Sequence, residues 1–78
     1  QYIRKGGVPM PRYSVDLSSL EPSKREEAFI LLNDNSFFAE RVIGKNGLEA
    51  AFVNWDSSED FESSAIFPKG CQCTLISH

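Results

Sequence analysis

The stretch FFAERVIGKNGLEAAFVNW, residues 37–55, predicts a β-hairpin around which the rest of the chain must be arranged. Aromatic and β-branched residues occur in both arms, and neither arm contains proline. Asn46-Gly47 favours a two-residue type I′ turn, which needs positive φ at both central residues. A four-residue turn that begins at Gly44 is the competing prediction.

The two-residue loop would pair Arg41 with Phe52, and alternation then assigns each side chain to a face. The predicted core face carries Phe38, Val42, Ala51, Val53 and Trp55, interrupted by Glu40. The second face carries Ala39, Ile43, Ala50 and Phe52, with Arg41 and Asn54 among them. Glu40 opposite Val53 is an anomaly that indicates an edge position, a wrong register or a functional role. A slip of one residue would exchange the two faces.

A helix is predicted from Glu21 to Asn33, directly before the hairpin. Pro22 suits a first helical turn, where its missing N–H costs nothing. Apolar residues are spaced for one face that would cover the hairpin; they are Ala28, Phe29, Leu31 and Leu32. The polar run 33–36 then ends the helix.

Two further strands are predicted at the ends of the chain. Residues 12–17 alternate, with Tyr13, Val15 and Leu17 on one side. Residues 71–76 form a closing strand. The segment 56–65, between the hairpin and this closing strand, reads as either a short helix or a loop. This order predicts an α+β fold, a small two-layer βαββαβ (ferredoxin-like) sandwich with an antiparallel sheet and one or two helices on one face.

The domain prediction is a flexible N-terminal arm over residues 1–11, followed by a single α+β domain over residues 12–78. Glycines and prolines at positions 6, 7, 9 and 11 argue against regular structure in the arm. Met10 is the only methionine. Residues 1–9 are therefore interpreted either as an addition made for expression or as part of a longer chain.

Charge and cysteine content restrict the partners. The net charge of −3 leaves no basic footprint, so nucleic acid is an unlikely partner, and no apolar run of about 18 residues indicates a membrane span. Cys71 and Cys73 are interpreted as small buried apolar residues, since a zinc site usually needs four ligands. No metal or cofactor is predicted. Two free cysteines favour a reducing, cytoplasmic setting.

No catalytic set is recognisable, because the only histidine, His78, is the last residue. The leading hypothesis is a small non-enzymatic protein-binding module (inhibitor, adaptor or regulator) that uses an exposed sheet face and an acidic edge. Its predicted partner-binding residues are Arg41, Ile43, Phe52, Asn54, Glu59, Asp60 and Glu62. The alternative is a homo-oligomeric small-molecule-binding protein or enzyme subunit with its site at the subunit interface.

Overall fold

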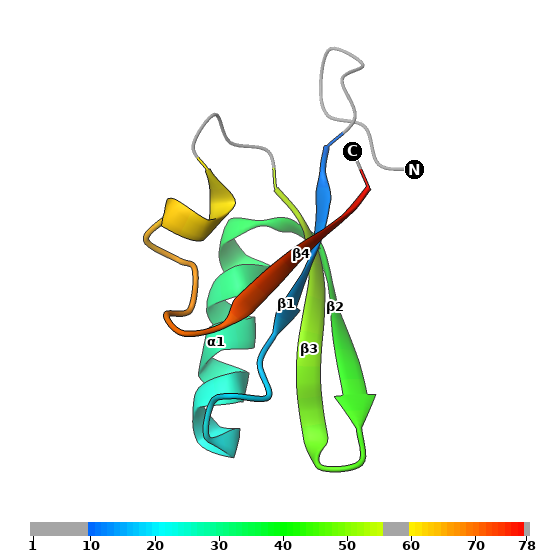
Figure 1. The fold of residues 1–78 in the computed structure, drawn as a ribbon, viewed down its shortest axis with the longest axis vertical. Helices are drawn as coiled ribbons and strands as arrows, with labels where there is room; N and C mark the ends of the chain where they lie inside the picture. Colours follow the sequence, from blue (N-terminus) through cyan, green and yellow to red (C-terminus); the bar gives the residue numbers. More distant parts are fainter. Residues whose placement is uncertain (1–9, 56–59, 78) are drawn as a thin grey trace.

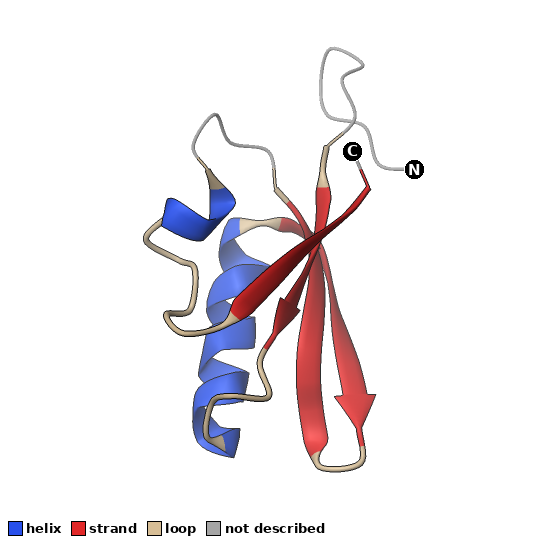
Figure 2. Cartoon of the chain, in the orientation of Figure 1, coloured by secondary structure: helices blue, strands red, loops and turns tan. Residues whose placement is uncertain are grey.

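The computed structural model describes residues 10–55 and 60–77, in which one helix packs against a four-stranded sheet. Every strand pairing is antiparallel, and the strand order across the sheet is β2-β3-β1-β4. Figures 1 and 2 show the helix lying along one side of the sheet. The elements are β1 (Arg12–Asp16), α1 (Pro22–Asn35), β2 (Phe37–Gly44), β3 (Gly47–Asn54), the 3₁₀ turn η1 (Phe61–Ser63) and β4 (Gln72–Ser77).

The predicted class, a small α+β protein with an antiparallel sheet, is confirmed. The ferredoxin-like arrangement is not confirmed, because α1 is the only α-helix in the described part of the chain. Where the sequence predicts a helix or a loop over 56–65, the described residues form only the single turn η1, and residues 56–59 lie outside the description.

Helix α1 begins at Pro22, one residue after the predicted start at Glu21, and proline suits this position because it lacks the N–H that a first helical turn leaves unpaired. It ends at Asn35, two residues beyond the predicted end. Side chains extend it there: Asn35 Nδ2 donates to the Leu31 carbonyl at 2.9 Å, and Ser36 Oγ donates to the Leu32 carbonyl at 2.5 Å. These side-chain bonds give the carbonyls of the last helical turn a second donor.

The hairpin turn is the four-residue turn that begins at Gly44, so the type I′ prediction is wrong. Gly44 pairs with Gly47, and only Gly47 in the turn has a positive φ, 91°. A turn followed by a left-handed glycine gives the strands a suitable twist without placing Asn46 in a strained conformation. The register of residues 40–42 therefore differs from the prediction by one residue: Glu40 pairs with Phe52, and Arg41 pairs with Ala51.

This shift exchanges the faces of residues 40–42 of β2, so the predicted sharing of one face by Arg41 and Phe52 is wrong. Arg41 lies on the side of α1, whereas Glu40 and Phe52 lie on the side that α1 leaves open. Two irregularities bend the hairpin further, one between Phe37 and Glu40 and one between Val42 and Ile43. At the first of them Phe38 adopts a φ of 54°.

The core lies between α1 and the sheet, and one aromatic residue of η1 completes it. Phe61 is 1% exposed, and its ring centroid lies 4.9 Å from that of Tyr13, 5.0 Å from Trp55 and 5.1 Å from Phe67. Met10 is buried as well, so the folded unit includes residue 10 of the predicted arm. The other buried apolar residues are Val15, Leu17, Phe29, Leu32, Leu48, Ala51, Val53 and Cys71.

Candidate functional site

The open face of the sheet, which the sequence predicts as a partner-binding surface, carries a polar network. Arg12 forms an ion pair with Glu40, and its guanidinium lies 5.6 Å from the centre of the Phe52 ring. Arg12 also donates to Asn54 Oδ1 at 2.5 Å. Asn54 is 1% exposed, and its amide donates to the Met10 carbonyl at 3.2 Å. The network therefore fixes the N-terminal segment to β1 and β3.

The structure brings together only some of the predicted partner-binding residues. Phe52 and Asn54 meet through Arg12 on the open face. Arg41 lies on the other face, where its guanidinium is 4.3 Å from the Phe29 ring centre and 2.6 Å from a Glu26 carboxylate oxygen.

The remaining predicted partner-binding residues lie away from this network. Ile43, next to the hairpin turn, is 64% exposed. Asp60 and Glu62 are exposed on either side of the buried Phe61, and Glu59 is outside the described residues. A role for any of these residues in binding stays a prediction.

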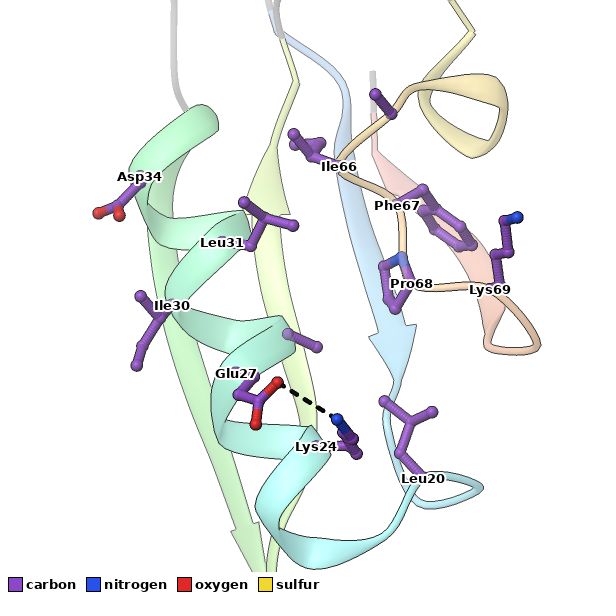
Figure 3. Close-up of a pocket in the computed structure, with 12 residues that line it drawn as sticks. Leu20, Lys24, Glu27, Ile30, Leu31, Asp34, Ile66, Phe67, Pro68 and Lys69 are labelled. Carbon is purple, nitrogen blue, oxygen red and sulfur yellow. Dashed lines mark ion pairs between the residues drawn. The ribbon is translucent and has the colours of Figure 1, made fainter.

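A groove of about 520 Å³ lies between the outer side of α1 and the segment 65–69. In Figure 3, Leu31 extends from the helix toward this segment, with Ile66, Phe67 and Pro68 across from it. The apolar residues that line the groove are Leu20, Ala28, Ile30, Leu31, Ala65, Ile66, Phe67 and Pro68. Its charged lining is Lys24, Glu27, Asp34 and Lys69.

The groove exists because α1 is apolar on two sides. Phe29 and Leu32 are buried against the sheet, while Leu31 remains 45% exposed. The sequence interpretation assigned all of these residues to one stripe and missed the groove. The signal was present: at about 100° per residue, Leu31 points well to one side of the direction shared by Phe29 and Leu32.

The charges along the groove are of both signs. Lys24 Nζ lies 3.6 Å from a Glu27 carboxylate oxygen, and both side chains are more than half exposed. An exposed pair of this kind contributes about 0–1 kcal/mol and is easily exchanged for other partners. With Asp34 and Lys69 also in the lining, the groove favours neither anions nor cations as a class.

The two thiols are free and poorly suited to chemistry. Cys71 is buried and Cys73 is partly buried, in agreement with their interpretation as small apolar side chains. Burial raises the pKa of both thiols, and the nearby charges of Glu62 and Asp60 contribute to raising the pKa of Cys73 to about 11. Both therefore stay protonated at neutral pH, where only a thiolate would attack or bind metal. Residues 10–55 and 60–77 contain no group of three side chains suited to holding a metal ion.

Comparisons of the chain with protein-family models, curated proteins and solved structures give no match. The helix in the described part of the chain is not long and apolar enough to cross a membrane. The geometry of the described residues therefore carries the functional argument alone.

Proposed function

We propose that the chain is a small protein-binding module whose contact surface is the groove beside α1. The observation that carries the proposal is an apolar hollow of about 520 Å³ that no described segment fills. Apolar surface exposed in this way on a small protein usually marks a site of interaction. The proposed class, an inhibitor, adaptor or regulator, is the one the sequence favours, whereas the proposed surface differs from the predicted sheet face.

The occupant we propose is an amphipathic helix of another protein. The α1 residues that line the groove, from Lys24 through Glu27 and Leu31 to Asp34, recur at intervals of three and four. That spacing forms the ridges on which helices pack. At a rise of 1.5 Å per residue, the ten steps from Lys24 to Asp34 span about 15 Å, which is two to three turns of a partner helix.

The ends of the groove favour a partner helix antiparallel to α1. Lys24 lies at the N-terminal end of the groove-lining stripe and Asp34 at the C-terminal end. An antiparallel helix would bring its partly negative C-terminus toward Lys24 and its partly positive N-terminus toward Asp34. Each such contact stabilises by about 0.3–1 kcal/mol, which is enough to select an orientation but not to supply the affinity.

The test compares the partner proteins that three immobilised forms of this chain retain. The three forms are wild type, Leu31→Lys and Ile43→Lys. Both substitutions replace an exposed apolar residue with lysine, but only Leu31 lines the groove. A protein retained by wild type and Ile43→Lys, and lost from Leu31→Lys, supports the proposal. A synthetic peptide of its binding segment should then gain helical circular dichroism on mixing. The proposal would be overturned if all three forms had equal helical content and retained the protein equally.

We also propose that the fold is a ferredoxin-like sandwich whose second helix is reduced to η1. The support is that β3 pairs antiparallel with both β1 and β2, which therefore run in the same direction with α1 between them in the chain. Backbone chemical shifts over residues 56–65 test this proposal. A run of helical values longer than η1 would contradict the idea that the second helix is reduced to one turn.

A further inference from the structure

Strand β4 forms one edge of the sheet, and no strand among the described residues pairs with its outer side. Its six residues include no charge and no proline. The opposite edge, β2, carries Glu40 and Arg41 and is bent by the irregularity at Phe38. Charges and bulges are the features that keep sheet edges from pairing with other chains, so β4 is the less protected edge.

The exposed side of β4 is regular and partly apolar. It pairs with β1 without interruption from Gln72 to Leu75, and the irregularity in this ladder falls at its C-terminal end. Leu75 is 43% exposed and Ile76 is 49% exposed. An added strand would satisfy the outer backbone groups of β4 and cover part of these side chains.

Carboxylates flank this edge on both sides of the sheet. On the side of α1, the exposed residues Asp60 and Glu62 flank Phe61, whose ring centre lies 4.9 Å from that of Tyr13, the β1 partner of Leu75. On the open side, the exposed Asp16 pairs across the sheet with Gln72 of β4. Two basic residues lie near β4: Lys69 in the preceding turn, and Arg12, which pairs across the sheet with Ser77 and forms an ion pair with Glu40. The potential along the edge therefore favours a positively charged occupant.

We propose that the β4 edge binds an extended segment of another protein that carries lysine or arginine at alternate positions. Main-chain hydrogen bonds to β4 would provide affinity. Because alternate residues of a strand share one face, the basic side chains would all lie toward Asp60 and Glu62. A second copy of this chain fits less well, since edge-to-edge pairing would bring two sets of these carboxylates together.

The probe is a capped ten-residue peptide of alternating threonine and lysine, titrated into the isotope-labelled chain and followed by amide chemical shifts. We expect the largest shifts within residues 72–77, weakening as salt is added. The peptide of alternating threonine and glutamate is the matched control and should leave β4 unchanged. Shifts centred on β2 or on the α1 groove, or none at millimolar peptide, would overturn the proposal.

Two charge-reversed variants separate a specific site from general attraction. The double variant D60K/E62K should weaken binding of the lysine peptide about tenfold, as expected for the loss of two exposed ion pairs. The variant E27K/D34K makes the same change in net charge at the α1 groove and should bind normally. Equal weakening in both would assign the binding to net charge alone and reject the site. Leu31→Lys should not affect binding of this peptide. Failure of the β4 proposal can therefore be distinguished from failure of the groove proposal.

Discussion

Phe38 occupies a backbone conformation that suits glycine better than any residue with a side chain. Its φ is 54°, and it is the only described residue other than glycine with a positive φ. It lies where the pairing of β2 with β3 is irregular, and its side chain is 54% exposed. Backbone strain at this position can therefore be measured separately from the packing of the ring.

The comparison that isolates the strain is Phe38→Gly against Phe38→Ala, because both substitutions remove the same ring. A residue with a Cβ in the left-handed region costs about 1–2 kcal/mol. Glycine avoids that cost but loses about 0.5–1 kcal/mol more conformational entropy on folding. We therefore expect the Gly variant to have a free energy of unfolding higher than that of the Ala variant by about 0.5–1 kcal/mol, which is a Tm difference of about 2–8 °C.

Urea unfolding followed by the fluorescence of Trp55, the only tryptophan, provides the assay, since its ring lies 5.0 Å from Phe61 in the core. Glu40→Gly and Glu40→Ala form the control pair. Glu40 lies in the same strand without a positive φ, and both variants lose its ion pair with Arg12 equally. The order should be reversed there, with Ala the more stable. If Ala is also the more stable residue at position 38, the strain argument is refuted.

Two further predictions concern a buried amide and a buried thiol. Asn54→Ala should lower the free energy of unfolding by about 1–3 kcal/mol, because the Met10 carbonyl loses its donor in a buried site. The control, Asn35→Ala, removes an exposed side-chain hydrogen bond and should lower it far less. Equal losses in urea unfolding would contradict this prediction. The folded chain holds the Cys73 proton more tightly than the unfolded chain, so Cys73 should stabilise the fold at neutral pH and lose that contribution as pH rises from about 9 to about 11. Urea midpoints over this range should fall less steeply for Cys73→Ala than for wild type, and parallel slopes would count against the assignment.

Local signals in the sequence predicted the elements whose formation depends on neighbouring residues. Pro22 marked the start of α1, and the alternation from Tyr13 to Leu17 identified β1 and its buried side, where Val15 and Leu17 are fully buried. Phe61 was not predicted to complete the core, because its ring contacts come from Tyr13 and Trp55 on other elements. Such contacts leave no periodic signal in the sequence.

The hairpin itself was predicted, but its register was not. Gly44 and Gly47 allow two turns that differ by one residue, and the local sequence does not choose between them. The α1 groove was missed for a related reason. Apolar residues were counted toward a single helix face, although Leu31 and Leu32 must point in different directions.

The choice of register follows from how Glu40 and Arg41 can be accommodated. In the predicted register Glu40 would face α1 opposite Val53, on the side where the Glu26 carboxylate lies, and two like charges would repel there. In the observed register Glu40 meets Arg12 on the open side, and Arg41 faces α1 instead. Arginine fits there because its guanidinium lies over the Phe29 ring and also reaches the Glu26 carboxylate at the surface. The same slip places the charges of β2 in ion pairs on both sides of that edge. It therefore leaves the α1 groove and the uncharged β4 edge, rather than the predicted sheet face, as the surfaces open to a partner.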